Sequence, residues 1–418
     1  MRSHVKTMLS MIAFFLISLC LNISPADAKD GIRVGKFKVD SGVTLKGEYN
    51  DNIFWSAGNE KDDYIWTVTP KASIGYFDSL DNYMSLGYLV DLVKYSDYDD
   101  NNFQRHNPYF RFWYQSPACL YIKIDESYIN TEDPYGSENE YGLGLSTKRW
   151  NNTLAFTGGF NFAEKYGIEA SYRNYIECYD ETTDRWQDHV DKIYGIALFY
   201  KLSAKTKIFG QYRLKLVDYN EQEHGAKPKT GPAWSSTTSQ NNKQNNFFAG
   251  ARFTPFSKIS GEAKIGYGNI RYDNKTDRNG IAYSDKDTWV AETNIGYDIR
   301  TRTRIGFVLM RSYRVSSDEG ADAPGYFDTL AGIELTQKMI NKIAANIGFD
   351  WETLDYQKSG TEKYFDIYKI RAGLSYPLNE WLDIGVKYEY SKKTATESKY
   401  ESSEYKINSV SAFINAKL

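Results

Sequence analysis

The sequence predicts an all-β protein, a transmembrane antiparallel up-and-down β-barrel of about 18 strands. Three observations predict it: apolar and polar residues alternate in segments of about ten residues, the amino terminus has an export signal, and 16% of the 418 residues are aromatic. Alternation sends apolar side chains to one face of a strand and polar side chains to the other. In a barrel, one face then meets lipid and the other meets water.

Two segments near the end of the chain show the alternation most clearly. Over residues 409–418, apolar side chains occupy the even positions, and Ser, Asn and Lys fall at odd ones. Over residues 342–352, the apolar set occupies the odd positions. We therefore expect Ile347 to face lipid and its neighbour Asn346 to face the lumen.

The amino terminus has the three parts of an export signal. A positive region at Arg2 and Lys6 precedes an apolar stretch over 8–21 and a small-x-small site. The apolar stretch, at about 14 residues, is shorter than the roughly 20 that a transmembrane helix needs. We expect cleavage between Ala28 and Lys29, which divides the chain into a signal peptide over 1–28, a periplasmic lead-in over 29–40 and a barrel over 41–418.

The composition suits a barrel wall. The mean hydropathy is -0.59, yet the chain has 35 Tyr, 22 Phe and 9 Trp. Only every second residue of a barrel strand meets lipid, and Tyr and Trp gather at the two membrane interfaces. The formal net charge of -3 gives no sign of a nucleic-acid surface. A secreted β-sandwich or β-helix is the alternative class.

Two cysteines remain after the expected cleavage, Cys119 and Cys178. In the predicted topology they lie near opposite rims of the wall. A disulfide needs Cα atoms within about 7 Å of each other. We therefore expect two free thiols.

The connections alternate between short turns and longer polar loops, as the two rims of an outer-membrane barrel require. The longest loop, residues 221–241, is polar and aperiodic, which predicts a disordered segment or a constriction loop. An even number of strands puts both ends of the barrel at the periplasmic rim. The predicted strands cover 41–50, 63–77, 82–96, 104–115, 119–130, 152–162, 166–179, 188–201, 207–219, 242–253, 258–272, 283–299, 303–316, 326–337, 342–356, 362–376, 381–396 and 402–418.

Two stretches fit this pattern less well. Apolar and polar residues alternate only weakly over 138–150, and we interpret this segment as a loop or as an extension of the following strand. The alternative number of strands is 16. Alternation also changes phase between Ile407 and Val410. This change predicts a β-bulge near residues 408–409.

A short motif follows the first predicted strand. Tyr49, Asp51, Asn52, Ile53 and Phe54 form a Tyr-x-Asp-Asn-Ile-Phe run, which an acidic loop and a strand with a Thr-Pro step follow. This opening resembles the outer-membrane β-barrel family called putative beta-barrel porin 2, and the rest of the chain resembles that family in rhythm. The resemblance implies a link to exopolysaccharide assembly and export in Gram-negative bacteria. From the residues alone, we interpret the run as a strand end with an aromatic anchor.

Histidine is scarce, which argues against an enzyme. After cleavage His106, His189 and His224 remain, and no nucleophile can be placed beside any of them. We interpret them as loop-surface residues. The acidic run over 97–102 lacks the order of an EF-hand, so we prefer a solvated loop to a calcium site. We expect no catalytic residue, cofactor or metal.

The charged residues of the predicted lumen face have both signs. Charges on neighbouring strands can pair, which keeps the wall rigid around a hydrated interior and argues against a strong preference for one ion. A wall of about 18 strands is wide enough for an aqueous channel. The candidate lumen-lining residues are Arg213, Lys215, Arg252, Glu262, Lys264, Glu292, Asp298, Arg314, Asp350, Glu352, Lys369, Arg371, Lys387 and Glu389.

Two function classes follow from these features. The first is an outer-membrane channel for hydrophilic solutes, which the family resemblance extends to exopolysaccharide export. The second is a non-conducting structural barrel that binds partners of an envelope assembly. The expected partners are outer-membrane lipid, the barrel-insertion machinery, and polysaccharide or export-complex proteins. We expect no nucleic-acid partner.

Amino-terminal sequencing of the protein from membrane fractions tests the export signal. We expect the mature chain to begin at Lys29 and to fractionate with the outer membrane, because strand insertion requires prior export. A retained Met1 or an inner-membrane location would contradict this prediction.

Overall fold

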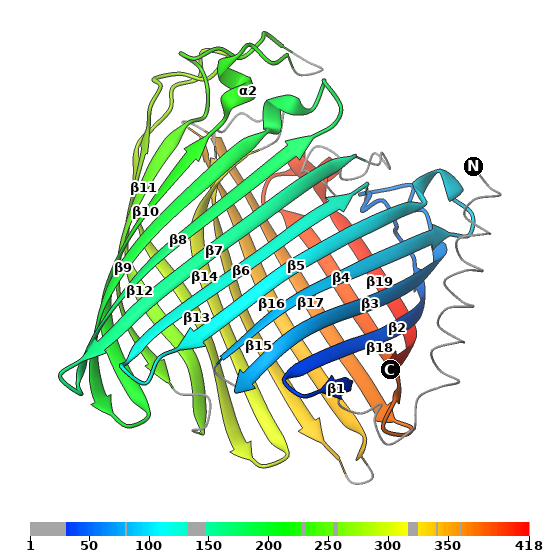
Figure 1. Cartoon of the computed structure of the whole chain (residues 1–418). Helices are drawn as coiled ribbons and strands as arrows, with labels where there is room; N and C mark the ends of the chain where they lie inside the picture. The colour runs from blue at the N-terminus through cyan, green and yellow to red at the C-terminus, as the bar shows by residue number, and fades with distance from the viewer. Residues whose placement is uncertain are drawn as a thin grey trace.

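The computed structural model is a closed antiparallel barrel of 18 strands, β2 to β19, with a short extra strand, β1 (Figure 1). β19 pairs with β2, which closes the sheet on itself. The predicted fold class is confirmed, and the strand count is the predicted 18. The structure describes residues 31–79, 82–132, 147–227, 231–253, 258–316, 325–339, 342–358 and 361–417.

The strands begin and end within a few residues of their predicted limits. The largest difference is at β2, which begins earlier, at Phe37. The bounds are β1 Ile32–Val34, β2 Phe37–Asn50, β3 Asp63–Ser79, β4 Asn82–Tyr95, β5 Phe103–Gln115, β6 Leu120–Thr131, β7 Arg149–Phe162, β8 Tyr166–Tyr179, β9 His189–Ser203, β10 Thr206–Asp218, β11 Asn242–Phe253, β12 Ile259–Tyr272, β13 Lys286–Arg300, β14 Thr303–Val315, β15 Gly325–Lys338, β16 Ala344–Lys358, β17 Thr361–Pro377, β18 Leu382–Ala395 and β19 Tyr405–Lys417.

The two rims of the barrel differ in the length of their connections. We call the rim with the long connections the loop end and the opposite rim the turn end; in an outer-membrane barrel these face the outside and the periplasm. β1 lies at the turn end and α2 at the loop end (Figure 1). Within the described part of the chain, no helix is long and apolar enough to span a membrane. The short helices of the loop end are η1 (Asp99–Asn101), η3 (Arg185–Gln187), α2 (Asn220–Glu223) and η5 (Ser398–Ser403).

The two faces of the wall differ in chemistry. On the outer face, Trp66 and Ile347 expose 56% and 55% of their surface. The opposite face is the concave one, as contacts between strands that are not neighbours show. Arg213 of β10, for example, pairs with Glu292 of β13. Asn346 lies on this inner face, beside a hollow of the lumen. The apolar and polar sets of β16 therefore face lipid and lumen respectively.

The last strand contains no bulge. Its register with β18 is unbroken from Tyr405 to Ala416, so the bulge predicted near residues 408–409 is wrong. Tyr405 and Ile407 stay on the inner face and are buried. The Tyr405 ring lies 5.1 Å from the ring of Trp55. The apolar phase changes because the inner face at the loop end packs against a loop there instead of facing water.

The seam between β2 and β19 extends beyond its ladder at the loop end. The Asp51 carboxylate accepts hydrogen bonds from the backbone N–H of Asn408 at 2.6 Å and from its Nδ2 at 2.7 Å. Fully buried Asn52 donates from Nδ2 to the carbonyl oxygens of Ser56 at 2.8 Å and Lys406 at 3.0 Å. We call these contacts to β19 the seam clasp. Two motif residues thus bind the last strand to the first.

β1 covers the same seam at the turn end. β19 pairs with β2 only as far as Gly42, whereas β1 pairs with residues 37–39 of β2. An unpaired strand edge would leave backbone donors and acceptors without partners. Ile32 and Val34 of β1 are exposed and share a face with Phe37. β1 therefore extends both the pairing and the apolar outer face of β2.

Some sequence predictions fall outside the described residues. These are the signal peptide with its cleavage site at Ala28 and Lys29, and most of the 138–150 segment. Residues 149 and 150 of that segment belong to β7. Cys119, just before β6, and Cys178, near the loop end of β8, are free thiols, as predicted.

Replacing Ile347 with Arg should destabilise the barrel far more than replacing Asn346 with Arg. Ile347 lies on the outer face, where an Arg at the bilayer midplane costs roughly 2 to 4 kcal/mol. Asn346 borders a polar hollow instead. Urea titrations in lipid vesicles compare the free energies of unfolding of the two variants. Equal losses would show that the faces are assigned wrongly.

The Asp51→Ala variant should lower the free energy of unfolding by about 1 to 3 kcal/mol, because two N–H donors of Asn408 lose their acceptor. Asp62→Ala is the matched control, since Asp62 accepts from the exposed Tyr49 hydroxyl at 3.3 Å and lies outside the seam clasp. The same titration measures both. A loss no larger than that of the control would mean that the clasp does not hold the seam.

Candidate functional site in the barrel lumen

Arg252 of β11 joins three strands across the inner face. Its Nη1 donates to Glu169 of β8 at 2.9 Å, and its Nε donates to Glu262 of β12 at 2.6 Å. Glu169 also accepts a hydrogen bond from the Tyr121 hydroxyl of β6 at 2.6 Å. β9 and β10 lie between β8 and β11, so only the concave side of the wall allows the contact with Glu169.

Lys264 of β12 continues this arrangement towards β13. Its ammonium lies 3.4 Å from Glu262 and 2.8 Å from Glu292, and it donates to Gln211 of β10 at 3.1 Å. Arg213 pairs with the other carboxylate oxygen of Glu292. We call the connected set the wall network; its members are Tyr121, Glu169, Gln211, Arg213, Arg252, Glu262, Lys264 and Glu292.

A second group of paired charges lies on β16 and β17. Arg371 is 2.7 Å from Asp350, and Lys369 is 3.7 Å from Glu352. Both pairs join adjacent strands of the wall. Opposite charges on neighbouring strands stabilise the pairing and leave little net charge for a passing ion.

β18 adds two further charged side chains to this side of the lumen. Lys387 and Glu389 border an inner hollow of about 750 Å³, together with Lys369 and Arg371. The Lys387 ammonium lies 5.2 Å from the ring of Phe413. Tyr95 and Phe103 are among the aromatic residues that line the same hollow, which therefore has both polar and aromatic walls.

The remaining predicted lumen residues pair locally. Asp298 pairs with Arg304 at 3.1 Å near the turn end. Lys215 pairs with Asp191 of β9 at 2.7 Å, and Arg314 pairs with Asp328 of β15 at 2.8 Å. The structure places the whole predicted set on the inner face, in several groups and not at one point.

Sequence reasoning missed several members of these groups. Glu169, Asp191 and Asp328 were not among the candidates, although each pairs with one of them. The alternation of the sequence could have identified Glu169. It shares a face of β8 with Gly167 and Ser171, whereas the residues between them face outwards. Asp191 and Asp328 lie diagonally across the ladder from Lys215 and Arg314 on neighbouring strands, so strand assignment could have suggested them. Glu169 and Arg252 lie on strands that are not neighbours, so strand assignment could not have paired them.

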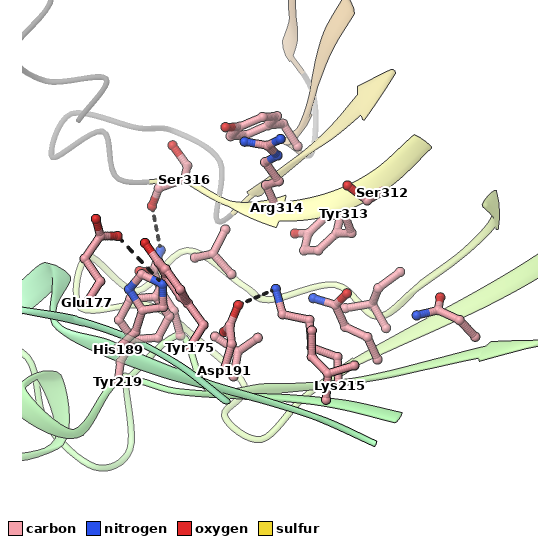
Figure 2. Close-up of a pocket in the computed structure, with 18 of the residues that line it drawn as sticks. Tyr175, Glu177, His189, Asp191, Lys215, Tyr219, Ser312, Tyr313, Arg314 and Ser316 are labelled. Atoms are coloured by element: carbon pink, nitrogen blue, oxygen red, sulfur yellow. Dashed lines mark hydrogen bonds and ion pairs between the residues drawn. The ribbon is translucent and has the colours of Figure 1, made fainter. Parts of the chain in front are cut away.

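A cavity of about 510 Å³ lies in the loop-end half of the lumen. Figure 2 shows Glu177, His189, Asp191 and Lys215 on the wall strands, with the end of β14 up to Ser316 across the space from them. Charged groups of both signs and several tyrosines line it. Such walls suit a hydrated polar solute.

His189 faces this cavity, so its interpretation as a loop-surface residue is wrong. It begins β9, and its Nδ1 donates to the carbonyl oxygen of Gln187 at 2.9 Å. Its Nε2 lies 4.0 Å from Glu177, and its ring packs against Tyr175 and Tyr219. The nearby helix η3 turns the chain so that the first residue of β9 points inwards.

The other two histidines do not join this site. His106 lies in β5 on the outer face, where its Nδ1 is 2.7 Å from the Tyr88 hydroxyl. His224 follows α2 at the loop end. The three histidines are therefore dispersed over the barrel.

The described part of the long loop packs against its neighbours instead of being disordered. Gln222 is fully buried, and its Nε2 donates to the Trp186 carbonyl oxygen at 2.8 Å and to Gln240 Oε1 at 3.0 Å. Trp234 stacks on Trp186 with ring centroids 6.3 Å apart. Gln240 also lines the lumen cavity. The loop thus covers part of the lumen at this end.

Asp188 lies outside the strands beside this loop. Burial, with a smaller contribution from the nearby Glu221, raises the pKa of the Asp188 carboxyl group to about 7. The hydrogen bond that its Oδ1 accepts from the Tyr179 N–H, at 2.7 Å, acts in the opposite direction. The charge at this rim therefore changes near neutral pH.

The remaining motif residues anchor the first loop. Ile53 is fully buried against Ile65 and Tyr95, and Phe54 packs on Tyr98. Tyr49 lies on the outer face, 5.1 Å from the ring of Tyr64. Together with the seam clasp, these contacts give the motif a structural role.

The acidic run over residues 97–102 forms part of the same rim. Asn102 accepts a hydrogen bond from the Tyr95 N–H at 2.7 Å, and Asn101 is buried. Among the described residues, no group of three or more His, Cys, Asp or Glu could hold a metal ion. The described lumen groups are arranged for pairing with one another.

A family model covers nearly the whole chain. The model of putative beta-barrel porin 2 matches residues 24–418. No curated protein matches the sequence. The family is the one whose opening motif the chain resembles at Tyr49 to Phe54.

Several solved structures have a similar fold. The FrpB iron transporter from Neisseria meningitidis, F3-3 variant, is 10% identical, with 90% of this chain and 65% of that chain covered and a TM-score of 0.43. The outer membrane protein opdK from Pseudomonas aeruginosa is 9% identical, with coverages of 91% and 99% and a TM-score of 0.46. The siderophore receptor PiuA from Acinetobacter baumannii is 11% identical, with coverages of 93% and 82% and a TM-score of 0.46.

The closed barrel, the paired charges of its lumen and the family match all indicate a porin-like protein. The family match identifies a porin-like β-barrel, in agreement with the closed sheet of the structure. This chain spans 65% of the length of the FrpB transporter, so that protein's activity does not transfer to it. The chain belongs to the putative beta-barrel porin 2 family.

Proposed function

We propose that the barrel is a channel for hydrophilic solutes and not an enzyme. The observation that carries this proposal is the inner face: charged side chains of both signs line it from the wall network to the hollow beside β18. A hydrated surface of this kind lowers the cost of moving a polar solute through the bilayer.

The pairing of these charges bears on selectivity. Arg252 has two carboxylate partners, and Glu292 has two cationic partners. A paired charge presents a weak field to a passing ion, because its partner cancels most of it at a distance. We therefore propose a pore with weak ion selectivity.

Access from the loop end is narrowed in this proposal by the loop over residues 221–241. Gln240 of this loop borders the lumen cavity, and Trp234 and Gln222 hold the loop against Trp186. The loop also contacts the neighbouring connection, where the Tyr283 hydroxyl donates to the Thr238 carbonyl oxygen at 2.9 Å. These contacts would hold it over the opening.

The resemblance to exopolysaccharide-associated barrels extends the proposal to a solute. We propose that the channel serves polysaccharide export, which the family resemblance suggests by analogy. The aromatic and polar walls of the inner hollow beside β18, where Tyr95 and Phe103 accompany Lys387, are compatible with sugar rings. The rates at which oligosaccharides and simple salts enter proteoliposomes can be compared to test this solute.

A non-conducting structural barrel is the second candidate. The packed loop end favours it, since buried side chains such as Gln222 and Trp234 fill part of that opening. In this case the loops or the turn end would bind partners of an envelope assembly. Conductance of the folded protein separates the two candidates.

Replacing residues 223–240 with a short Gly/Ser turn should raise the single-channel conductance and speed the entry of oligosaccharides. The replacement removes the contacts of Trp234 and Gln240 but leaves the strands intact, because β11 begins at Asn242. Planar bilayers measure the conductance, and proteoliposome swelling measures the entry.

The matched control replaces the exposed residues 57–60 of the first loop with Gly and Ser. It should leave conductance unchanged. If the native protein and the loop variant are both folded and both non-conducting, the structural barrel becomes the better account.

A further inference from the structure

The ends of β13 and β14 separate at the loop end. Their ladder begins at the turn end and stops at the pair Ala291–Arg311. Both strands continue: β13 extends to Lys286, and β14 extends to Val315. β14 nevertheless remains paired with β15 as far as Val315–Gly325. The end of the β14–β15 hairpin has therefore left the wall on its β13 side.

The direction of two aromatic side chains shows where this end goes. Tyr313 and Phe327 face each other across the β14–β15 ladder and share a face with Phe307 and Ile333. Phe307 and Ile333 are on the outer face and expose 43% and 44% of their surface. Tyr313 and Phe327 expose only 3% and 5%. Their side of the hairpin is covered by protein.

The covering residues belong to the inner face of the wall. Ile270 of β12, which lines the lumen cavity, packs against Tyr313 and Phe327. The Tyr313 hydroxyl lies 2.6 Å from the hydroxyl of Tyr272, the last residue of β12. Tyr313 and Phe327 are on the outer face of β14 and β15, yet they pack against the inner face of β12. The end of the β14–β15 hairpin therefore lies inside the lumen. We call residues 312–316 and 325–328 the inner lip.

The inner lip bounds the lumen cavity. Ser312, Tyr313, Arg314 and Ser316 line it opposite the β8–β10 wall (Figure 2). At its tip, the Ser316 carbonyl oxygen accepts a hydrogen bond from Gln240 Nε2 at 3.3 Å. The lip and the long loop therefore meet across the lumen.

The unpaired end of β13 offers the lip a second position. Extending the observed register by one residue at a time would place Ser312 beside Val290, Tyr313 beside Trp289 and Arg314 beside Thr288. An unpaired strand edge is a ready partner for a strand end. Tyr313 would then return to the outer face next to Trp289, which is 45% exposed there. Tyr and Trp are favoured at a membrane interface.

Internal contacts allow the lip to move as a unit. Arg314 and Asp328 are 2.8 Å apart and join its two strands. Arg311 lies at the branch point, with its guanidinium 4.8 Å from the rings of both Trp289 and Phe327. The Arg314–Asp328 pair and the β14–β15 ladder would be kept in both positions, whereas the contacts with Ile270 and Tyr272 would be exchanged for pairing with β13.

We propose that the inner lip is a gate: it narrows the lumen when packed on Ile270 and Tyr272, and opens it when its strand zips onto the free edge of β13. This inference rests on the proposed channel function. It differs from the narrowing by the long loop, because the moving element is part of the wall. The Gln240–Ser316 contact couples the two.

A disulfide that captures the zipped position tests the gate. In a Cys119→Ser, Cys178→Ser background, the test pair Trp289→Cys and Tyr313→Cys would be directly opposed only after zipping. The control pair Thr293→Cys and Leu309→Cys is matched to it, because these positions are already opposed in the same ladder. The two pairs are four positions apart along the strands, so they have the same hydrogen-bonding pattern and lie on the same face. Oxidised and reduced forms are compared by peptide mass and by single-channel conductance.

Oxidation of the test pair should raise the conductance, and reduction should restore it, whereas oxidation of the control pair should leave the conductance unchanged. Failure of the test pair to cross-link while the control pair does, or a cross-link without effect on a conducting channel, would overturn the gate. If the test pair cross-links but no form conducts, the lip moves and the channel function has failed.

A single substitution provides a test without cysteines. Tyr272→Phe keeps the ring that stacks on Tyr283 but removes the hydroxyl that contacts Tyr313. Loss of one hydrogen bond should raise the ratio of open to closed channels by about 2- to 10-fold. Tyr297→Phe, on the outer face, is the control and should not change it. An unchanged ratio in Tyr272→Phe would contradict the role of this contact in the closed gate.

Discussion

Closure of a single sheet on itself is the constraint on which this structure depends. Hydrocarbon offers no water to satisfy backbone N–H and C=O groups, so the first and last barrel strands must pair along their whole length in the membrane. The β2–β19 ladder provides this pairing, the seam clasp of Asp51 and Asn52 extends it at the loop end, and β1 continues it at the turn end. The family-like motif therefore serves closure.

Curvature of the closed wall then determines the chemistry of the lumen. Side chains on the concave face reach past their neighbouring strands, as Arg252 does to Glu169 and Arg213 does to Glu292. Such pairs neutralise buried charges that would otherwise be costly and leave a polar surface of low net field. Towards the loop end, tyrosines, the long loop and the inner lip join the ion pairs around the lumen. The lumen thus passes from a charged wall to a packed and narrower end.

Much of this arrangement could be predicted from alternation alone. Period two identifies the strands, their faces and the charged inner set, because a pleated strand leaves each side chain only two directions. It could not reveal which charges meet, since Glu169 and Arg252 are brought together by curvature. It also failed where packing replaces solvent: Ile407 faces inwards, and Tyr313 faces protein on the lipid side of its own strand. The odd or even position of a residue in its strand predicts which face of the sheet it lies on. A bend in the backbone determines what that face contacts.

The central claim is that paired charges surround a conducting, weakly selective lumen. The most direct test is the reversal potential of the purified native protein in a planar bilayer that separates two potassium chloride concentrations. The account predicts measurable single-channel current with a reversal potential near zero, because neither sign of charge dominates the wall. A folded protein that carries no current, or a reversal potential close to the limit for one ion, would contradict it.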